Sequence, residues 1–131
     1  MDAVTSPRRC QRGFTLIELL ITVVVLGILA SIAFQGLHLY RERAFNAAVK
    51  TDLRNALAAE EGYFADNGSY LAFSVTDGGT SVTPEFSASN QVSITATLVG
   101  ADLRLEGTHG ATPTTWCLST ATGQIVEGTG C

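Results

Sequence analysis

The sequence predicts an α+β protein in which a long N-terminal helix packs, by its second half, on a small antiparallel sheet of about four strands. Two changes of pattern along the chain predict this arrangement. No formally charged residue occurs from Leu19 to Tyr40, and beyond Tyr40 apolar residues recur every four positions as far as Leu57. From Val92 onward the apolar period falls to two, as in half-buried strands.

Composition limits the chain to one globular domain with one apolar segment. The 131 residues are 46% hydrophobic and carry a formal charge of −4. Residues 1–13 contribute +2 of that total, so the remainder of the chain carries −6. An acidic surface disfavours nonspecific binding to nucleic acid, and we predict no specific nucleic-acid partner.

The first 40 residues are typical of a targeting segment followed by a membrane span. Residues 1–13 contain three arginines and no apolar periodicity, and we expect them to form a leader peptide. Residues 14–40 are expected to form an apolar helix, whose 22 uncharged residues would span about 33 Å, close to the ~30 Å of a bilayer core. Three arginines before the span and two after it favour a cytoplasmic N-terminus.

A conventional secretory signal is the alternative for this region. Ser31-Ile32-Ala33 offers a small-x-small site for signal peptidase, and cleavage there would release a protein that starts at Phe34. Glu18 inside the apolar segment and the length of that segment argue against this interpretation, because signal sequences have apolar regions of about 7 to 15 residues.

Residues 41–131 are expected to form a globular head. Its helix is predicted over residues 41–61, where Phe45, Val49, Leu53 and Leu57 form one apolar stripe. Residues 62–90 are predicted to be a surface loop with at most a short strand, and residues 91–131 an antiparallel sheet. Strand patterns occur at residues 92–98, 103–106, 115–118 and 124–127, with a turn at Gly100-Ala101 and a turn-rich stretch over 107–115.

Glu18 is the most informative residue of the chain, because a carboxylate at membrane depth is costly unless something uses its charge. It lies in the run Gly13-Phe14-Thr15-Leu16-Ile17-Glu18-Leu19-Leu20. This run resembles the processing motif of type IV pilins and the related pseudopilins, which are filament-forming proteins. The resemblance is close from Arg12 to about Tyr40 and looser through residues 63–70 to the last cysteine.

The resemblance implies a role for three residues near the start of the apolar segment. Prepilin peptidase would cut between Gly13 and Phe14 and methylate the new Phe14 amine. In the filament, Glu18 would face the Phe14 amine of a neighbouring copy, which would fix the stagger between subunits while apolar area supplies cohesion. Without such a partner, Glu18 would instead extend its carboxylate to the membrane surface or take up a proton.

Cys117 and Cys131 match the C-terminal disulfide loop that is common among type IV pilins. Removal of the leader would discard Cys10 and leave this even pair. A bridge between the two cysteines would contribute about 3 kcal/mol on the chain-entropy model and requires an oxidising compartment. The alternative is a pair of reduced cysteines in a cytosolic domain.

Gln35 departs from the family, since many pilins have proline at this position. Gly27 and Gly36 remain as weak points of the helix. We therefore expect local loosening of the helix around Gly27 when the protein is in a filament.

Nothing in the sequence indicates catalysis, a metal or a cofactor. His38 and His109 have no cysteine or carboxylate at metal-ligand spacing, and no nucleophile elbow is present. Asp66-Asn67-Gly68 indicates a turn rather than a cation loop. We therefore predict that the protein is not an enzyme.

The function predicted from the resemblance is that of a structural subunit of a type IV pilus. Its partners would be other copies or related pilins, prepilin peptidase, and the pilus assembly platform in the inner membrane. The precursor would span the inner membrane once, and the assembled filament would be extracellular. Such filaments serve adhesion, twitching motility or DNA uptake, and the sequence does not select among these roles. The alternatives are a pseudopilin of a type II secretion system, a single-pass anchored binding domain that does not polymerise, and a secreted enzyme released after Ala33.

Overall fold

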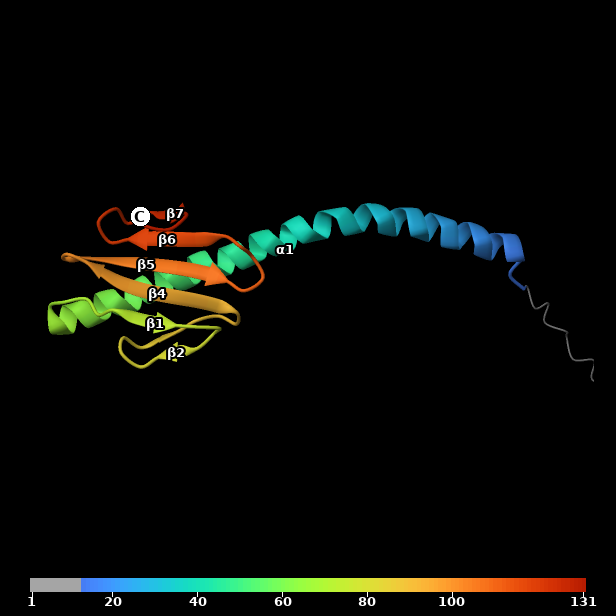
Figure 1. The fold of residues 1–131 in the computed structure, drawn as a ribbon. Coiled ribbons are helices and arrows are strands. Elements are labelled where there is room, and N and C mark those ends of the chain that lie inside the picture. The colour runs from blue at the N-terminus through green and yellow to red at the C-terminus, as the bar shows by residue number, and fades with distance from the viewer. Residues whose placement is uncertain (1–12) are drawn as a thin grey trace, which may run out of the picture. The chain divides into compact units, whose positions relative to one another are not determined.

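The computed structural model describes residues 13–131, so the predicted leader lies almost wholly outside the described residues. The chain divides into two compact units, one that ends at Leu37 and one that comprises His38–Cys131. One helix, α1, and seven strands make up the described structure (Figure 1). Their bounds are α1 Leu16–Asn67, β1 Phe73–Val75, β2 Thr80–Ser81, β3 Phe86–Ser87, β4 Val92–Val99, β5 Asp102–His109, β6 Thr115–Ser119 and β7 Ile125–Glu127.

The first unit is the apolar end of α1. Every described residue from 13 to 34 is exposed, including all the large apolar side chains. By length and composition this stretch of α1 could cross a membrane. A helix that is apolar on all sides and wholly exposed requires a nonaqueous environment, which lipid or other copies of the helix can provide.

The second unit, hereafter the head, is a five-stranded antiparallel sheet that packs on the C-terminal part of α1 (Figure 1). The strand order is β1-β4-β5-β6-β7, and β2 and β3 form a separate two-stranded hairpin. The central strands β4 and β5 pair over eight residues, from Val92↔His109 to Val99↔Asp102. Gly100 has a φ of 68° in the two-residue turn between them, as a tight hairpin requires.

The core lies between the apolar stripe of α1 and the inner face of the sheet. Val49, Leu53 and Ala56 from α1 are fully buried, and they pack with inward-facing residues of the central strands such as Ile94 and Leu105. This arrangement confirms the predicted fold of a helix on a small antiparallel sheet.

The helix is longer than predicted, which corrects its expected end at Glu61. It continues through Gly62 to Asn67, where the side-chain Nδ2 donates to the carbonyl of Tyr63 at 2.9 Å. Gly68 then ends the helix with a φ of 71° and donates its N–H to the carbonyl of Phe64 at 2.7 Å. Asn67 and Gly68, rather than Gly62, therefore supply the stop signal.

Two further expectations for the sheet are corrected. The predicted loop 62–90 contains three short strands, and β1 adds a fifth strand to the sheet through pairs such as Phe73↔Ala96. The stretch expected to be turn-rich from residue 107 instead continues as β5 to His109. Gly107 pairs with Ile94 and Trp116 within the sheet, and a glycine is required there because a Cβ would lie only 2.7 Å from Cγ1 of Val49 in the helix.

Candidate assembly site

The N-terminus of α1 is organised by a hydrogen-bonded pair, Thr15 and Glu18. The carboxylate oxygen Oε2 of Glu18 accepts from the backbone N–H of Thr15 at 2.9 Å and from its hydroxyl at 2.8 Å. The N–H of Glu18 in turn donates to the Thr15 Oγ1 at 3.3 Å. This reciprocal arrangement is a capping box, and it satisfies N–H groups that the first turn of a helix cannot pair internally.

The capping box places the Glu18 carboxylate beside the predicted processing site. Its Oε2 bonds to the backbone N–H of Thr15, the residue directly after Phe14. Gly13 and Phe14 lie outside the helix, and among the described residues no atom beyond the chain neighbours lies within 4 Å of a Cβ built on Gly13. The structure thus brings all three predicted N-terminal site residues to one exposed helix end.

Sequence reasoning identified Glu18 but missed the contribution of Thr15. The signal was present, since a Thr-x-x-Glu spacing at the start of an apolar helical run is the pattern of a capping box.

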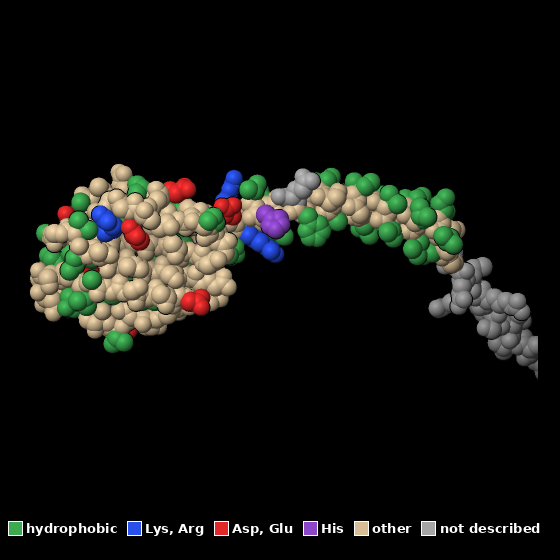
Figure 2. Space-filling model, viewed as in Figure 1, with side chains coloured by type: hydrophobic (Ala, Val, Ile, Leu, Met, Phe, Trp, Pro, Cys, Tyr) green, Lys and Arg blue, Asp and Glu red, His purple; other side chains and the backbone are tan. Residues whose placement is uncertain are grey.

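Apolar side chains surround this site. Figure 2 shows them along the N-terminal part of the helix, where Phe14 and Leu16 are each 84% exposed. Once lipid or other helices cover these side chains, the Glu18 carboxylate loses its solvation by water. Burial of this charge is then costly unless an opposite charge or a hydrogen-bond donor pairs with it.

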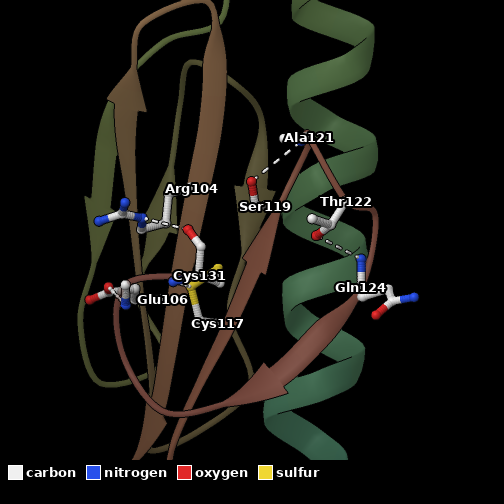
Figure 3. Close-up of a disulfide and its surroundings, with 9 residues drawn as sticks. Arg104, Glu106, Cys117, Ser119, Ala121, Thr122, Gln124 and Cys131 are labelled. Carbon is white, nitrogen blue, oxygen red and sulfur yellow. Dashed lines mark hydrogen bonds between the residues drawn. A yellow bond between two sulfur atoms is a disulfide. The ribbon is translucent and has the colours of Figure 1, made fainter.

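The structure joins Cys117 to Cys131 by a disulfide, with 5.8 Å between their Cα atoms. The last residues fold back over the outer face of β5 (Figure 3). There, Nε of Arg104 donates to the carbonyl of Cys131 at 3.2 Å, and the N–H of Gly130 donates to Oε1 of Glu106 at 3.0 Å. The bridge and these two bonds hold the end of the chain on the sheet.

Two buried carboxylates of α1 were not recognised in the sequence. Asp52 accepts from the N–H of Ser89 at 2.7 Å and from its hydroxyl at 3.1 Å, which fixes the segment before β4. Glu60 is fully buried and its Oε2 accepts from the N–H of Leu71 at 3.0 Å, whereas its Oε1 has no hydrogen-bond partner among residues 13–131. Burial raises the pKa of Glu60 despite the lowering effect of the Leu71 bond. Both residues occur beside the apolar stripe of the helix, and this position is the sequence signal that could indicate their burial.

The remaining candidates belong to the packing of the head or its surface. His38 is exposed, whereas His109 is buried and stacks on Phe45, with ring centroids 4.3 Å apart. Phe64 stacks on Tyr70 with centroids 4.6 Å apart. Among residues 13–131, no group of three or more His, Cys, Asp or Glu side chains could hold a metal ion.

Comparison with known proteins identifies the N-terminal segment. Residues 8–34 match the prokaryotic N-terminal methylation motif. The chain is 38% identical over 68 residues to the type IV major pilin protein PilA of Myxococcus xanthus, covering 52% of this chain and 30% of that protein. It is 41% identical over 64 residues to the type IV wide pilus major component PilA4 of Thermus thermophilus, covering 49% of each.

A third relative comes from a different assembly. The chain is 40% identical over 60 residues to the type II secretion system core protein G of Klebsiella pneumoniae, covering 46% of this chain and 43% of that protein. The matched segments thus span at most about half the length of these three relatives. The methylation motif and the α+β fold agree with these similarities, so the N-terminal half of the chain is similar to type IV pilins and to a type II secretion core protein.

Proposed function

We propose that this protein is a structural subunit of a type IV pilus, assembled through the N-terminal part of α1. The observation that carries the proposal is the exposed apolar helix end with a carboxylate beside the processing site. Side chains from Phe14 to Phe34 are exposed around the whole helix, and Glu18 interrupts them one turn from Phe14. A helix of this kind can remain in lipid as a monomer and pack against identical helices in a filament.

Processing would occur at the non-helical residues that precede the capping box. We propose that prepilin peptidase cuts between Gly13 and Phe14 and methylates the Phe14 amine. Both residues are exposed and outside the helix, which suits entry of the backbone into a peptidase site. Cleavage creates a positive charge next to the Thr15–Glu18 pair, where the partial positive charge at the N-terminus of the helix would otherwise be balanced by the carboxylate alone.

In the filament, Glu18 would pair with the Phe14 amine of a neighbouring copy. The two hydrogen bonds from Thr15 converge on Oε2, and a carboxylate can accept further bonds at its other oxygen. In a dry helix bundle, an unpaired charge costs much more than a paired one, so this contact would select one stagger between copies. The apolar side chains would supply most of the cohesion.

The proposed route sets the partners and the location. The precursor would cross the inner membrane once with its N-terminus in the cytoplasm, and the head would fold where disulfides form. Prepilin peptidase and the assembly platform would act on it there, and the filament would extend outside the cell. In this scheme the protein works by assembly and not by catalytic turnover.

The direct test is the mass and N-terminal sequence of the mature protein. We expect a chain that begins with N-methylated Phe14 and contains a closed Cys117–Cys131 bridge. An N-terminus at Phe34 would instead identify a secreted protein. A full-length chain recovered from cells with active prepilin peptidase would refute the proposed processing.

Substitution of Glu18 tests assembly separately. We expect Glu18→Ala and the nearly isosteric Glu18→Gln to insert in the membrane but to yield few or no filaments, because both remove the charge. Unchanged filaments in both variants would contradict the proposed pairing.

A type II secretion pseudopilin is the second candidate, and the similarity to core protein G favours it specifically. Both candidates share the N-terminal chemistry, so deletion of the gene must separate them. Loss of surface filaments with normal secretion would support the pilus subunit. Loss of secretion with filaments retained would support the pseudopilin.

A further inference from the structure

The charges of the head are segregated along the chain. Residues 38–131 contain ten Asp and Glu but only five Lys and Arg. No Lys, Arg or His occurs from residue 55 to 103, whereas six acidic residues do. That segment forms the end of α1, strands β1 to β4 and the first residues of β5, and it includes the exposed Asp77 and Glu85, which flank the β2–β3 hairpin.

The opposite edge carries a basic groove, which lies between α1 and the turn that joins β6 to β7. It has a volume of about 450 Å³. Its lining residues are Lys50, Arg54 and Leu57 from the helix, and Leu118, Gly123, Gln124 and Ile125 from the β6–β7 region. Strands β7 and β2 lie at opposite edges of the head (Figure 1).

The two cations of the groove differ in how they are held. Lys50 is half-buried, with its Nζ 3.6 Å from the centroid of the Trp116 ring, an arrangement that attracts a cation to the face of an indole. Arg54 lies one helical turn further along and is exposed. The groove therefore presents positive charge beside the partly buried apolar side chains of Leu57 and Ile125.

The β2–β3 turn, residues 82–85, has complementary chemistry. Val82 is 87% exposed, the highest value among the large hydrophobic residues described, and Glu85 is also exposed. The turn is fixed at its base, because Phe86 is only 5% exposed and lies 6.0 Å from Phe73 between ring centroids. It thus offers one apolar and one acidic side chain from a firmly held position.

We propose that the basic groove of one copy binds the β2–β3 turn of a second copy. Val82 would contact Leu57 and Ile125, and Glu85 would pair with Arg54 and Lys50. Because the two surfaces are on opposite edges, the contact is heterologous and leaves a free groove and a free turn at the ends of each row. Such a contact extends into an open row where the rotation between copies does not close into a ring, as a filament requires. The inference rests on the proposed filament function.

A second copy fits the groove better than nucleic acid does. The head is acidic as a whole, and two cations in a groove of this size give little attraction for an extended polyanion against that background. By contrast, the same chain supplies an exposed carboxylate and an exposed apolar side chain three residues apart.

Charge reversal in the full-length protein tests the pairing. We expect Arg54→Glu and Glu85→Lys each to lower the yield of sheared surface filaments on the order of tenfold, the effect of one unfavourable contact on an equilibrium. The double variant should restore filaments. Matched controls are Arg43→Glu and Asp66→Lys, which make the same changes of charge at exposed positions outside both surfaces and should leave filament yield unchanged.

Processing separates this inference from the proposed function. In every variant the mature Phe14 terminus should form, since the substitutions lie in the head. Two outcomes would overturn the groove contact but leave the filament role intact. In the first, wild type forms filaments and neither single variant lowers their yield. In the second, the single variants lower the yield and the double variant does not restore it. Absence of wild-type filaments would instead refute the filament role.

A cross-link gives a second measurement that does not depend on yield. Val82→Cys with Gln124→Cys should produce a ladder of disulfide-linked oligomers from filaments on non-reducing gels, whereas either single substitution should not. The native bridge should not compete, because Cys117 is fully buried and already bonded to Cys131. Filaments of the double cysteine variant without a ladder would contradict the contact.

Discussion

Gly107 is the position where the head should tolerate a single methyl group least. A Cβ built on Gly107 lies 2.7 Å from Cγ1 of Val49, 2.9 Å from Cδ1 of Ile94 and 3.2 Å from Cγ of Leu53. All three neighbours are fully buried, so none can swing into solvent to make room. Either α1 must move away from the sheet or several core side chains must leave their rotamers.

The expected cost of Gly107→Ala follows from that crowding. Overpacking a well-filled core costs about 1 to 3 kcal/mol, and contacts this short with three immobile neighbours favour the middle of that range or above. We therefore expect a loss of about 2 kcal/mol in the free energy of unfolding. For a unit of this size, such a loss lowers the melting temperature by roughly 10 °C.

Urea denaturation of the full chain in a mild detergent can measure this loss. Trp116 is the only tryptophan and lies in the head, where its Nε1 donates to Oδ1 of Asn46 at 3.3 Å, so its fluorescence should report unfolding of the helix–sheet interface. The midpoint should fall without a change in the m-value.

Gly110→Ala is the matched control for this measurement. The nearest atoms to its Cβ lie at 3.8 Å, an ordinary contact distance, and its φ is not positive. The same glycine-to-alanine change should therefore be neutral or slightly stabilising there. Equal midpoints for the two variants would show that the approach of α1 to β5 is not a rigid constraint.

Three further perturbations test other parts of the structure. Because burial raises the pKa of Glu60, folding favours its protonated form, and wild-type stability should fall as pH rises from the ordinary pKa through the raised one. Glu60→Gln should remove this fall. The difference between the urea midpoint of this variant and that of wild type should therefore increase in favour of the variant as pH rises from 4 to 7, and a difference that stays constant with pH would contradict this reasoning. Reduction of the Cys117–Cys131 bridge should lower the free energy of unfolding by about 3 kcal/mol. The urea midpoint should therefore be lower with a reductant than without it, and equal midpoints would contradict this expectation. Thr15→Val removes one donor to Glu18 and should lower sheared filament yield less than Glu18→Ala does, whereas Thr15→Ser should keep the wild-type yield; a Thr15→Val yield equal to wild type would show that the hydroxyl is dispensable.

The sequence predicted the parts of the fold that have a strong apolar period. The helical stripe through Val49 and Leu53 and the alternation along β4 each mark one buried face, and both elements were placed correctly. The end of α1 is predicted too early, because the glycine at position 62 is a common stop signal through which this helix continues. An exposed glycine costs a helix only about 1 kcal/mol, which the surrounding helix can bear.

Elements that depend on tertiary contacts could not be predicted from the local periodicity of apolar residues. Strand β1 has only three residues, and it is placed by pairing with β4 and by the bonds that Asp52 and Glu60 make to nearby segments. Gly107 is a residue type typical of turns, yet it lies in a strand. The reason for glycine at this position is the proximity of α1, which leaves no room for a side chain. Such information depends on residues more than ten positions away.

The candidate site divides in the same way. The Thr15–Glu18 capping box depends on residues three apart, so its signal is local and is present in the sequence. The basic groove depends on the meeting of α1 with the β6–β7 turn, about 70 residues later in the chain, and no spacing in the sequence indicates it.

One continuous helix carries two different packing patterns, and this separates assembly from folding. From Leu16 to Phe34 its apolar side chains point in all directions and stay exposed. In the head, only one face is buried, which carries the stripe through Val49 and Leu53 together with Asp52 and Glu60. Since the core of the head uses residues from Ala48 onward, it does not depend on what surrounds the first segment. A change at Glu18 should therefore alter assembly without lowering the stability of the head. Conversely, a change at Gly107 should lower that stability without removing the groups that pair in the proposed filament.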